Sequence, residues 1–178
     1  MNEKSVLRKQ IRESTKKLPL SYRIKAGEII GEKLVSSPEF IRAQSIFIYL
    51  STPFEPETRY IIKKALEEGK KVYAPVCISK GIMKAAEIQK NTLFVKGYMG
   101  ISEPSEQAEY YENGFDLAVV PCLTASADGK RLGHGGGFYD IFLQKHKCPA
   151  ICLCFGRLLT DDIPMEPHDK KADKVLTD

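Results

Sequence analysis

The chain has 178 residues, of which 43% are hydrophobic and 28% are charged, so it can bury a core and we expect a single domain over residues 1–178. Its net charge of +4 suits a small anionic ligand and does not indicate a nucleic-acid-binding protein. No apolar stretch approaches the length of a membrane span, and the polar N-terminal segment has no apolar signal region, so we expect a cytoplasmic protein without a membrane partner.

Two helices are predicted at the start of the chain. Residues 3–17 show a helical apolar pattern through Leu7 and Ile11, and Pro19 should end this helix. Ser21 is a suitable cap for a second helix. The inward face of that second helix is expected to comprise Ala26, Ile29, Ile30 and Leu34.

An alternation of strands and helices follows, as is typical of a parallel sheet. Residues 45–50 are typical of a buried strand, residues 57–68 of an amphipathic helix that ends at Gly69, and residues 71–76 of a second strand. This unit predicts a parallel pair of strands joined by a right-handed crossover.

The rest of the chain continues the sheet after a less regular stretch over residues 82–111. The further extended segments are predicted at residues 83–88 and 93–95, as a hairpin-like excursion, and at residues 115–121, 149–155 and 174–177. Together the elements predict an α/β fold, a single-domain three-layer sandwich with a mostly parallel central sheet and helices on both faces. Ligands of such sheets bind beyond the carboxyl ends of the strands.

Five cysteines fit a cytoplasmic protein. Their number is odd, they form no C-x-x-C pair, and most lie in apolar runs, so we interpret them as buried small hydrophobic residues rather than a zinc site. They are Cys77, Cys122, Cys148, Cys152 and Cys154.

The segment from Arg131 to Asp140 carries the strongest functional signal. Four of the five residues from Gly133 to Gly137 are glycine, and a helical pattern begins directly after them. Backbone amides in such a loop can surround an oxyanion, and the start of the helix favours negative charge. Arg131 adds a planar cation on the entry side, so the segment predicts a site for nucleotide phosphates.

Asp140 extends this hypothesis to a metal. A carboxylate beside a phosphate would repel it unless a divalent cation bridges the two, which points to Mg²⁺. The alternative is a tight glycine turn followed by an acid that favours the first turn of a helix. The segment is not the P-loop, because Arg131 follows Gly129-Lys130 where Ser or Thr is required.

Other groups are candidates for the same site. Lys4, Arg8 and Arg12 share one helical face and could hold phosphate oxygens, although a solvated basic face is the plain alternative. Glu55 lies in a rigid loop after a buried strand, where it could accept hydrogen bonds from a heterocycle, or be an ordinary loop acid. Asp169 follows Pro167-His168 and could be a second metal ligand or part of a turn.

These motifs, in this order, resemble the 5-formyltetrahydrofolate cyclo-ligase family nearly from end to end. The resemblance rests on the basic helix of Lys4 and Arg8, on Tyr49-Leu50-Ser51 followed by Glu55, and on Gly100-Ile101-x-Glu103-Pro104. It also rests on Asp116 to Pro121, on the segment from Gly129 to Asp140, and on Pro167-His168-Asp169 with Asp173.

The resemblance implies roles for individual residues. It implies that ATP is bound by Lys4, Arg8, Arg131, Leu132, Gly133, His134, Gly135, Gly136, Gly137, Phe138 and Tyr139, with Arg131 stabilising charge in the transition state. It implies that the reduced folate, with or without a polyglutamate tail, is bound by Leu50, Glu55, His134, Gly135, Gly136, Gly137 and Phe138. It implies that Asp140 and Asp169 hold Mg²⁺, and we expect a monomer.

The family's reaction needs no protein nucleophile. In similar enzymes the formyl oxygen of the folate attacks the γ-phosphate of ATP, the nitrogen N10 closes the ring on the resulting imidate, and phosphate leaves. This chain departs from the family pattern at His134, Phe138, Leu158 and the stretch Thr124-Ala125-Ser126. Two alternatives follow: an ATP-binding relative with a different formyl-amide or pterin-like substrate, and a non-catalytic binder of folate or nucleic acid.

Overall fold

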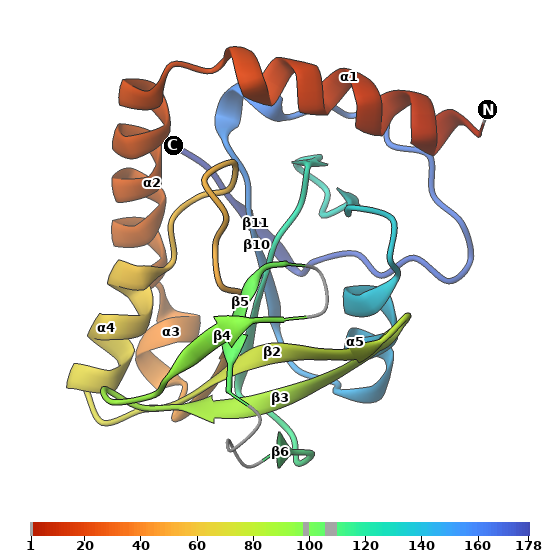
Figure 1. Cartoon of the computed structure of the whole chain (residues 1–178). Helices are drawn as coiled ribbons and strands as arrows, with labels where there is room; N and C mark the ends of the chain where they lie inside the picture. The colour runs from red at the N-terminus through yellow and green to blue at the C-terminus, as the bar shows by residue number, and fades with distance from the viewer. Residues whose placement is uncertain (1, 98–99, 106–109) are drawn as a thin grey trace.

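A seven-stranded mixed sheet forms the centre of the computed structural model, which describes residues 2–97, 100–105 and 110–178 (Figure 1). The strand order is β11-β10-β7-β1-β2-β3-β6. The first five strands in this order are mutually parallel, and β3 and β6 are antiparallel to their neighbours. They are β1 (Ser45–Ile48), β2 (Lys71–Ser79), β3 (Ile82–Ile88), β6 (Tyr110–Tyr111), β7 (Leu117–Val120), β10 (Ala150–Leu153) and β11 (Lys174–Leu176).

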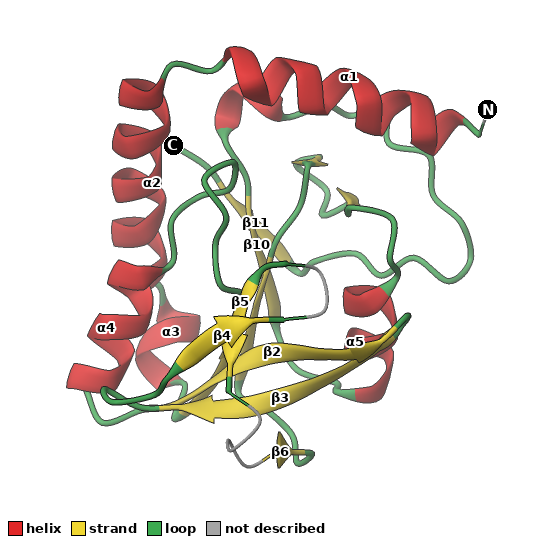
Figure 2. Ribbon diagram, in the orientation of Figure 1, coloured by secondary structure: helices red, strands yellow, loops and turns green. Residues whose placement is uncertain are grey.

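Helices cover both sides of this sheet, as the ribbon diagram shows (Figure 2). Helices α2, α3 and α4 lie together on one side, α5 lies on the other, and α1 crosses above the strands (Figure 1). The helices are α1 (Glu3–Lys17), α2 (Leu20–Val35), α3 (Pro38–Arg42), α4 (Arg59–Glu67) and α5 (Phe138–Lys145), with a 3₁₀ turn at Gly156–Leu158. The predicted α/β architecture with a mostly parallel sheet is therefore confirmed.

The order of the strands creates a crevice in the middle of the sheet. The β1–α4–β2 connection runs from β1 toward one edge, whereas the β7–α5–β10 connection runs from β7 toward the other. Because β1 and β7 are adjacent and their connections diverge, the chain leaves an opening beyond their carboxyl ends. This switch point positions the site described below.

An aromatic cluster joins the sheet to α5. Phe47 of β1 is fully buried, and its ring stacks on that of Phe142 with the centroids 4.0 Å apart. Phe115 packs against both rings, at centroid distances of 5.6 Å. The helix that follows the glycine loop is therefore held to the central strand by these three rings.

Two short hairpins lie outside the main sheet. The strands β8 (Thr124–Ala125) and β9 (Arg131–Leu132) pair across a turn that contains Asp128-Gly129. The strands β4 (Phe94–Lys96) and β5 (Ser102–Pro104) form the second hairpin. The sequence suggested that residues 83–88 and 93–95 belong to one hairpin, and this was wrong: β3 pairs with β2, and β4 pairs with β5. Residues 98–99 and 106–109 of the irregular stretch lie outside the described residues.

Two further details of the helix predictions were wrong. Helix α2 begins at Leu20 with Pro19 as its N-cap, so Ser21 lies inside the first turn and caps nothing. Ile29, which was expected on the inward face of this helix, is 36% exposed. The reason is that α4 approaches α2 along the face that carries Gly31, where a Cβ atom would lie 3.2 Å from the ring of Tyr60. In the described part of the chain, no helix is long and apolar enough to cross a membrane.

Replacing Phe47 by alanine should lower the free energy of unfolding by about 3–5 kcal/mol, because it leaves a cavity between β1 and α5. Urea denaturation followed by circular dichroism measures this change. The matched control is Ile24→Ala on α2, whose side chain is 55% exposed, and which should change stability by about 0.5 kcal/mol or less. Equal losses in the two variants would contradict the assignment of Phe47 to the core.

Candidate functional site

A pocket of about 450 Å³ opens beyond the carboxyl ends of β1 and β7. Its walls come from α1, from the loop after β1, from the glycine loop before α5 and from the segment that precedes β11. Every residue that the sequence assigned to ATP, folate or metal lines this pocket. The structure thus brings together groups that lie as far apart in the chain as Lys4 and Asp169.

Helix α1 is attached to the glycine loop by its basic face. The Nε atom of Arg8 donates a hydrogen bond to the carbonyl oxygen of Gly133 at 2.9 Å. One turn further, Nη2 of Arg12 donates to the carbonyl oxygen of His134 at 3.3 Å. The helical spacing of these arginines directs both onto the loop, so the basic face is a wall of the pocket and not only a solvated surface.

The glycine loop has the geometry that its composition indicates. Gly135 has a φ of 105°, a conformation that residues with a side chain rarely adopt. A Cβ atom at this position would also lie 3.4 Å from Cζ of Arg8. The loop leads into α5 directly after Gly137, so the free N–H groups of the first helical turn lie at the pocket.

Lys4 lies at the opposite wall between two carboxylates. Its Nζ atom is 2.5 Å from Oδ2 of Asp169 and 2.6 Å from Oε2 of Glu166, and its side chain is only 7% exposed. Burial alone would lower the pKa of Lys4, but hydrogen bonds and charge attraction from Asp169 and Glu166 raise it above the ordinary value. Burial raises the pKa of Asp169, but the hydrogen bonds from Lys4 and from the backbone N–H of Glu166, together with the charge of Lys4, lower it below the ordinary value.

A second ion pair lies beside the glycine loop. Nη2 of Arg131 is 2.7 Å from Oδ1 of Asp140, and the Arg131 side chain is 2% exposed. The same Asp140 oxygen accepts the backbone N–H of Lys170 at 3.0 Å. Among the described residues, Nε of Arg131 is buried without a hydrogen-bond partner. A buried donor of this kind is costly, so it favours an acceptor brought by a ligand.

Glu55 faces the glycine loop from the loop after β1. Its Oε2 accepts the backbone N–H of Thr52 at 2.8 Å, and its Oε1 lies 3.2 Å from Nε2 of His134. Its side chain is only 8% exposed. Burial, and then the negative charge of Glu55, raise the pKa of Tyr139 well above its ordinary value, so this phenol stays neutral.

The donor set near Lys4 fits a divalent cation. Glu166, His168 and Asp169 each offer a ligand atom, and these atoms lie within 4.8 Å of one another. Carboxylate oxygens are the ligands that Mg²⁺ prefers. Asp140 lines the same pocket but is not a member of this group. Glu166 and His168 were not assigned to the site from the sequence, although they belong to the segment that supplied Asp169.

Comparison with known proteins identifies the family. The model of the 5-formyltetrahydrofolate cyclo-ligase family matches residues 1–178. The chain belongs to this family. It is 30% identical to the 5-formyltetrahydrofolate cyclo-ligase of Mycolicibacterium smegmatis over 184 residues, covering 98% of this chain and 93% of the relative. It is 27% identical to the enzyme of the same name from Mus musculus, covering 96% and 91% of the two chains.

A solved structure shows the same fold. The NMR structure of the 5,10-methenyltetrahydrofolate synthetase of Aquifex aeolicus superposes with a TM-score of 0.85 at 24% sequence identity. The match covers 97% of this chain and 88% of that one. The architecture of the cyclo-ligase family is therefore present over nearly the whole chain.

Several pocket residues of this family member were not found by sequence reasoning. Cys77 and Met83 come from β2 and β3, and Ile101 comes from the loop before β5. Burial, together with the carboxylate of Glu103, raises the pKa of Cys77 to about 12, so its thiol remains protonated. The signal that could have located Cys77 is its place near the carboxyl end of a parallel strand.

The stability of the protein should depend on pH through Asp169. Because the folded-state pKa of Asp169 lies below its ordinary value of 3.8, the ionised group adds stability above about pH 4, and this is lost as the pH falls through the folded-state pKa. Asp169→Asn should therefore lower the free energy of unfolding by about 1–3 kcal/mol at neutral pH. The difference from the wild type should shrink as the pH falls below the ordinary value of 3.8 and through the lower folded-state pKa.

Urea denaturation at a series of pH values, without added metal, measures this dependence. The control is Asp162→Asn, since Asp162 is exposed and its replacement should leave the free energy of unfolding unchanged at each pH. A destabilisation by Asp169→Asn that is equally large at acidic and neutral pH would show that the ionised pair with Lys4 is not its source.

Proposed function

We propose that the protein is an ATP- and Mg²⁺-dependent 5-formyltetrahydrofolate cyclo-ligase that forms 5,10-methenyltetrahydrofolate, ADP and phosphate. The observation that carries the proposal is the pocket, in which the basic face of α1, the glycine loop and the carboxylates Asp140 and Asp169 meet. Family membership over residues 1–178 supports the same reaction.

The phosphate side of the pocket fits ATP. Arg8 and Arg131 provide charge, the glycine loop and the start of α5 provide backbone N–H groups, and Nε of Arg131 has a hydrogen bond still to donate. These groups stabilise the charge that spreads over the transferring phosphoryl group. We assign ATP binding to Lys4, Arg8, Arg131, Leu132, Gly133, His134, Gly135, Gly136, Gly137, Phe138 and Tyr139.

The balance of charge in the pocket supports a metal. Among the residues that the structure describes, four basic side chains line it, namely Lys4, Arg8, Arg12 and Arg131, and four acidic ones, namely Glu55, Asp140, Glu166 and Asp169. A triphosphate would therefore meet no net attraction from these groups. Bound Mg²⁺ would neutralise carboxylates and phosphate oxygens together. We assign Asp140 and Asp169 to this ion, and Glu166 lies close enough to take part.

We assign the reduced folate to Leu50, Glu55, His134, Gly135, Gly136, Gly137 and Phe138. Glu55 has a fixed orientation, because the backbone of Thr52 holds one of its oxygens. The other oxygen, which lies 3.2 Å from Nε2 of His134, would accept N–H groups of the pterin ring. The formyl oxygen then attacks the γ-phosphorus and ADP leaves. N10 attacks the formyl carbon, and phosphate departs as the ring closes.

The alternative of a different substrate was based mainly on departures from the family pattern at Ala125 and Leu158. The departures at His134 and Phe138 do line the pocket, so they keep this alternative open, whereas those at Ala125 and Leu158 do not support it. Ala125 and Leu158 are buried, and neither is among the described residues that line the pocket. Thr124 donates a hydrogen bond to the carbonyl oxygen of Leu158, so these positions connect a hairpin to a 3₁₀ turn. The monomeric state and the cytoplasmic location remain predictions.

The direct test mixes purified protein with ATP, Mg²⁺ and 5-formyltetrahydrofolate and follows the near-ultraviolet absorbance of the methenyl product. We expect product to form only when both ATP and Mg²⁺ are present. Controls omit each in turn. Clear ATP binding without product would point to another substrate, and the absence of both would contradict the proposal.

Replacing Arg131 by alanine should reduce the turnover rate by about 30- to 1,000-fold, which corresponds to a loss of about 2–4 kcal/mol of transition-state stabilisation. The same absorbance assay measures the rate. The control is Arg59→Ala on α4, whose side chain is 88% exposed, and it should behave as the wild type. A loss well under tenfold for Arg131→Ala would rule out its role in charge stabilisation.

Replacing Asp140 by alanine should raise the Mg²⁺ concentration required for half-maximal rate by about tenfold or more, because a ligand of the ion is lost. A titration of Mg²⁺ at saturating ATP measures this shift. Asp161→Ala serves as the control, since Asp161 is exposed. An unchanged Mg²⁺ requirement in Asp140→Ala would show that Asp140 does not hold the metal.

A further inference from the structure

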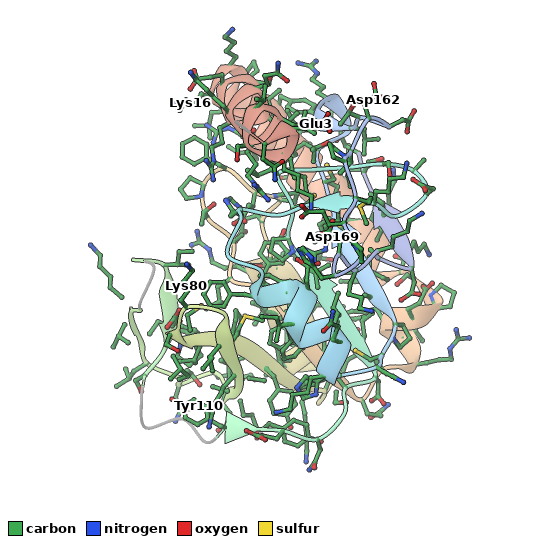
Figure 3. The ribbon with its side chains drawn as sticks, turned by 90° about the vertical axis from the view of Figure 1, so that its right-hand side faces the viewer. Glu3, Lys16, Lys80, Tyr110, Asp162 and Asp169 are labelled. Carbon is green, nitrogen blue, oxygen red and sulfur yellow. The ribbon has the colours of Figure 1, made fainter. Side chains whose placement is uncertain are left out.

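Lys4 occupies the place that a cation would take between two metal-type ligands. Its Nζ atom contacts Oδ2 of Asp169 at 2.5 Å and Oε2 of Glu166 at 2.6 Å. These oxygens belong to two of the three residues whose donor atoms could hold a divalent ion. The labelled Asp169 lies between α1 and α5 in the side view (Figure 3).

The ammonium group and a divalent ion cannot share these oxygens. A Mg²⁺ ion binds carboxylate oxygens at about 2.0–2.1 Å. An ion bound to both oxygens would therefore lie within a few ångströms of Nζ in its present position. Because the Lys4 side chain is only 7% exposed, solvent would screen little of the repulsion between the two cations.

We propose that, in the absence of nucleotide, the ammonium group of Lys4 occupies the cation position between Asp169 and Glu166. When the nucleotide binds, a divalent ion replaces the ammonium group there. This inference rests on the proposed function. In the exchange, Nζ of Lys4 leaves the two carboxylates and donates its hydrogen bonds to phosphate oxygens instead. The divalent ion then takes over Asp169, so neither the ammonium nor the carboxylate is left unpaired in the buried site.

Two features make Lys4 suited to this movement. It lies in the first turn of α1, on the face from which Arg8 already reaches the glycine loop, so a phosphate held by that loop is within the same pocket. Its ammonium group stands on a flexible four-carbon stem with three rotatable donors. A rotation of the stem is therefore enough to exchange partners.

The other ion pair of the pocket does not have this freedom. Asp140 is also held by the backbone N–H of Lys170, and the planar guanidinium of Arg131 is buried in a fixed orientation. Arg131 can keep Asp140 while its Nε donates to a ligand. The pocket thus combines one fixed pair with one that exchanges.

The exchange predicts that the metal and the nucleotide bind cooperatively. Without nucleotide, a divalent ion must displace the ammonium group of Lys4 to a position where that group has no new partner. With nucleotide present, the ammonium group pairs with the phosphates instead. By linkage, the nucleotide must then tighten metal binding by the same factor by which the metal tightens nucleotide binding. Removing the amine should strengthen binding of the free ion and weaken this coupling.

The test uses Mn²⁺ as the probe, with free Mn²⁺ measured by electron paramagnetic resonance on the purified full-length chain. Each protein is titrated with and without a non-hydrolysable ATP analogue, so the readout does not require turnover. The variant is Lys4→Met, which keeps the apolar stem and removes the charge. The matched control is Lys9→Met, an exposed lysine of the same helix.

We expect Lys4→Met to bind Mn²⁺ alone about tenfold tighter than the wild type, within the range of typical coupling free energies. The analogue should tighten Mn²⁺ binding strongly in the wild type and in Lys9→Met, and only weakly in Lys4→Met. Adding Asp169→Asn to Lys4→Met should abolish the gain. Equal or weaker binding of Mn²⁺ by Lys4→Met, or a gain that survives Asp169→Asn, would overturn the exchange.

The outcomes separate this inference from the proposed function. If the wild type binds the analogue and Mn²⁺ but Lys4→Met gains no affinity, the exchange fails and the ATP site stands. If the wild type does not bind the analogue at all, the proposed function fails as well. Should Lys4→Met not fold, as judged by circular dichroism, Lys4→Gln replaces it in the same titration with the same expectations.

Discussion

The attachment of α1 to the two segments that face it is the constraint on which the pocket depends. Arg8 binds the glycine loop and Lys4 binds the segment before β11, so one helix connects the two walls. The sheet supplies only the floor, at the switch point between β1 and β7. Helix α1 thereby adds to the direct link between the two segments, in which Asp140 accepts the backbone N–H of Lys170.

The strands and the helix that carries the loop explain why this arrangement is rigid. Helix α5 is fixed to β1 by the stacked rings of Phe47 and Phe142, and the loop begins at the short strand β9, so both of its ends are anchored. The preorganised loop can therefore present its N–H groups without reorganisation, which is what electrostatic stabilisation of a phosphoryl group requires.

The sequence was sufficient for the architecture, because the architecture depends on local patterns, and every residue that the family resemblance assigned to a ligand lines the pocket. Apolar runs located the parallel strands, and the glycine composition located the loop. The sequence was not sufficient for the other pocket residues, such as Cys77, Met83 and Glu166. Nor was it sufficient for the partners of the charged groups. Lys4, which was expected to bind phosphate, pairs with Asp169, which was expected to bind the metal and lies 165 residues away. No local sequence pattern indicates such a contact. Ile29 was misplaced for a related reason, since the approach of α4 to Gly31 decides which face of α2 is buried.

The separation between Lys4 and Asp169 has a consequence for how the protein is made. Because a ribosome releases the N-terminal helix first, α1 emerges with its basic face uncovered, and its carboxylate partners follow only after a further 165 residues have been added. The pocket can therefore form only late in synthesis, and a chain interrupted before residue 169 has an incomplete wall.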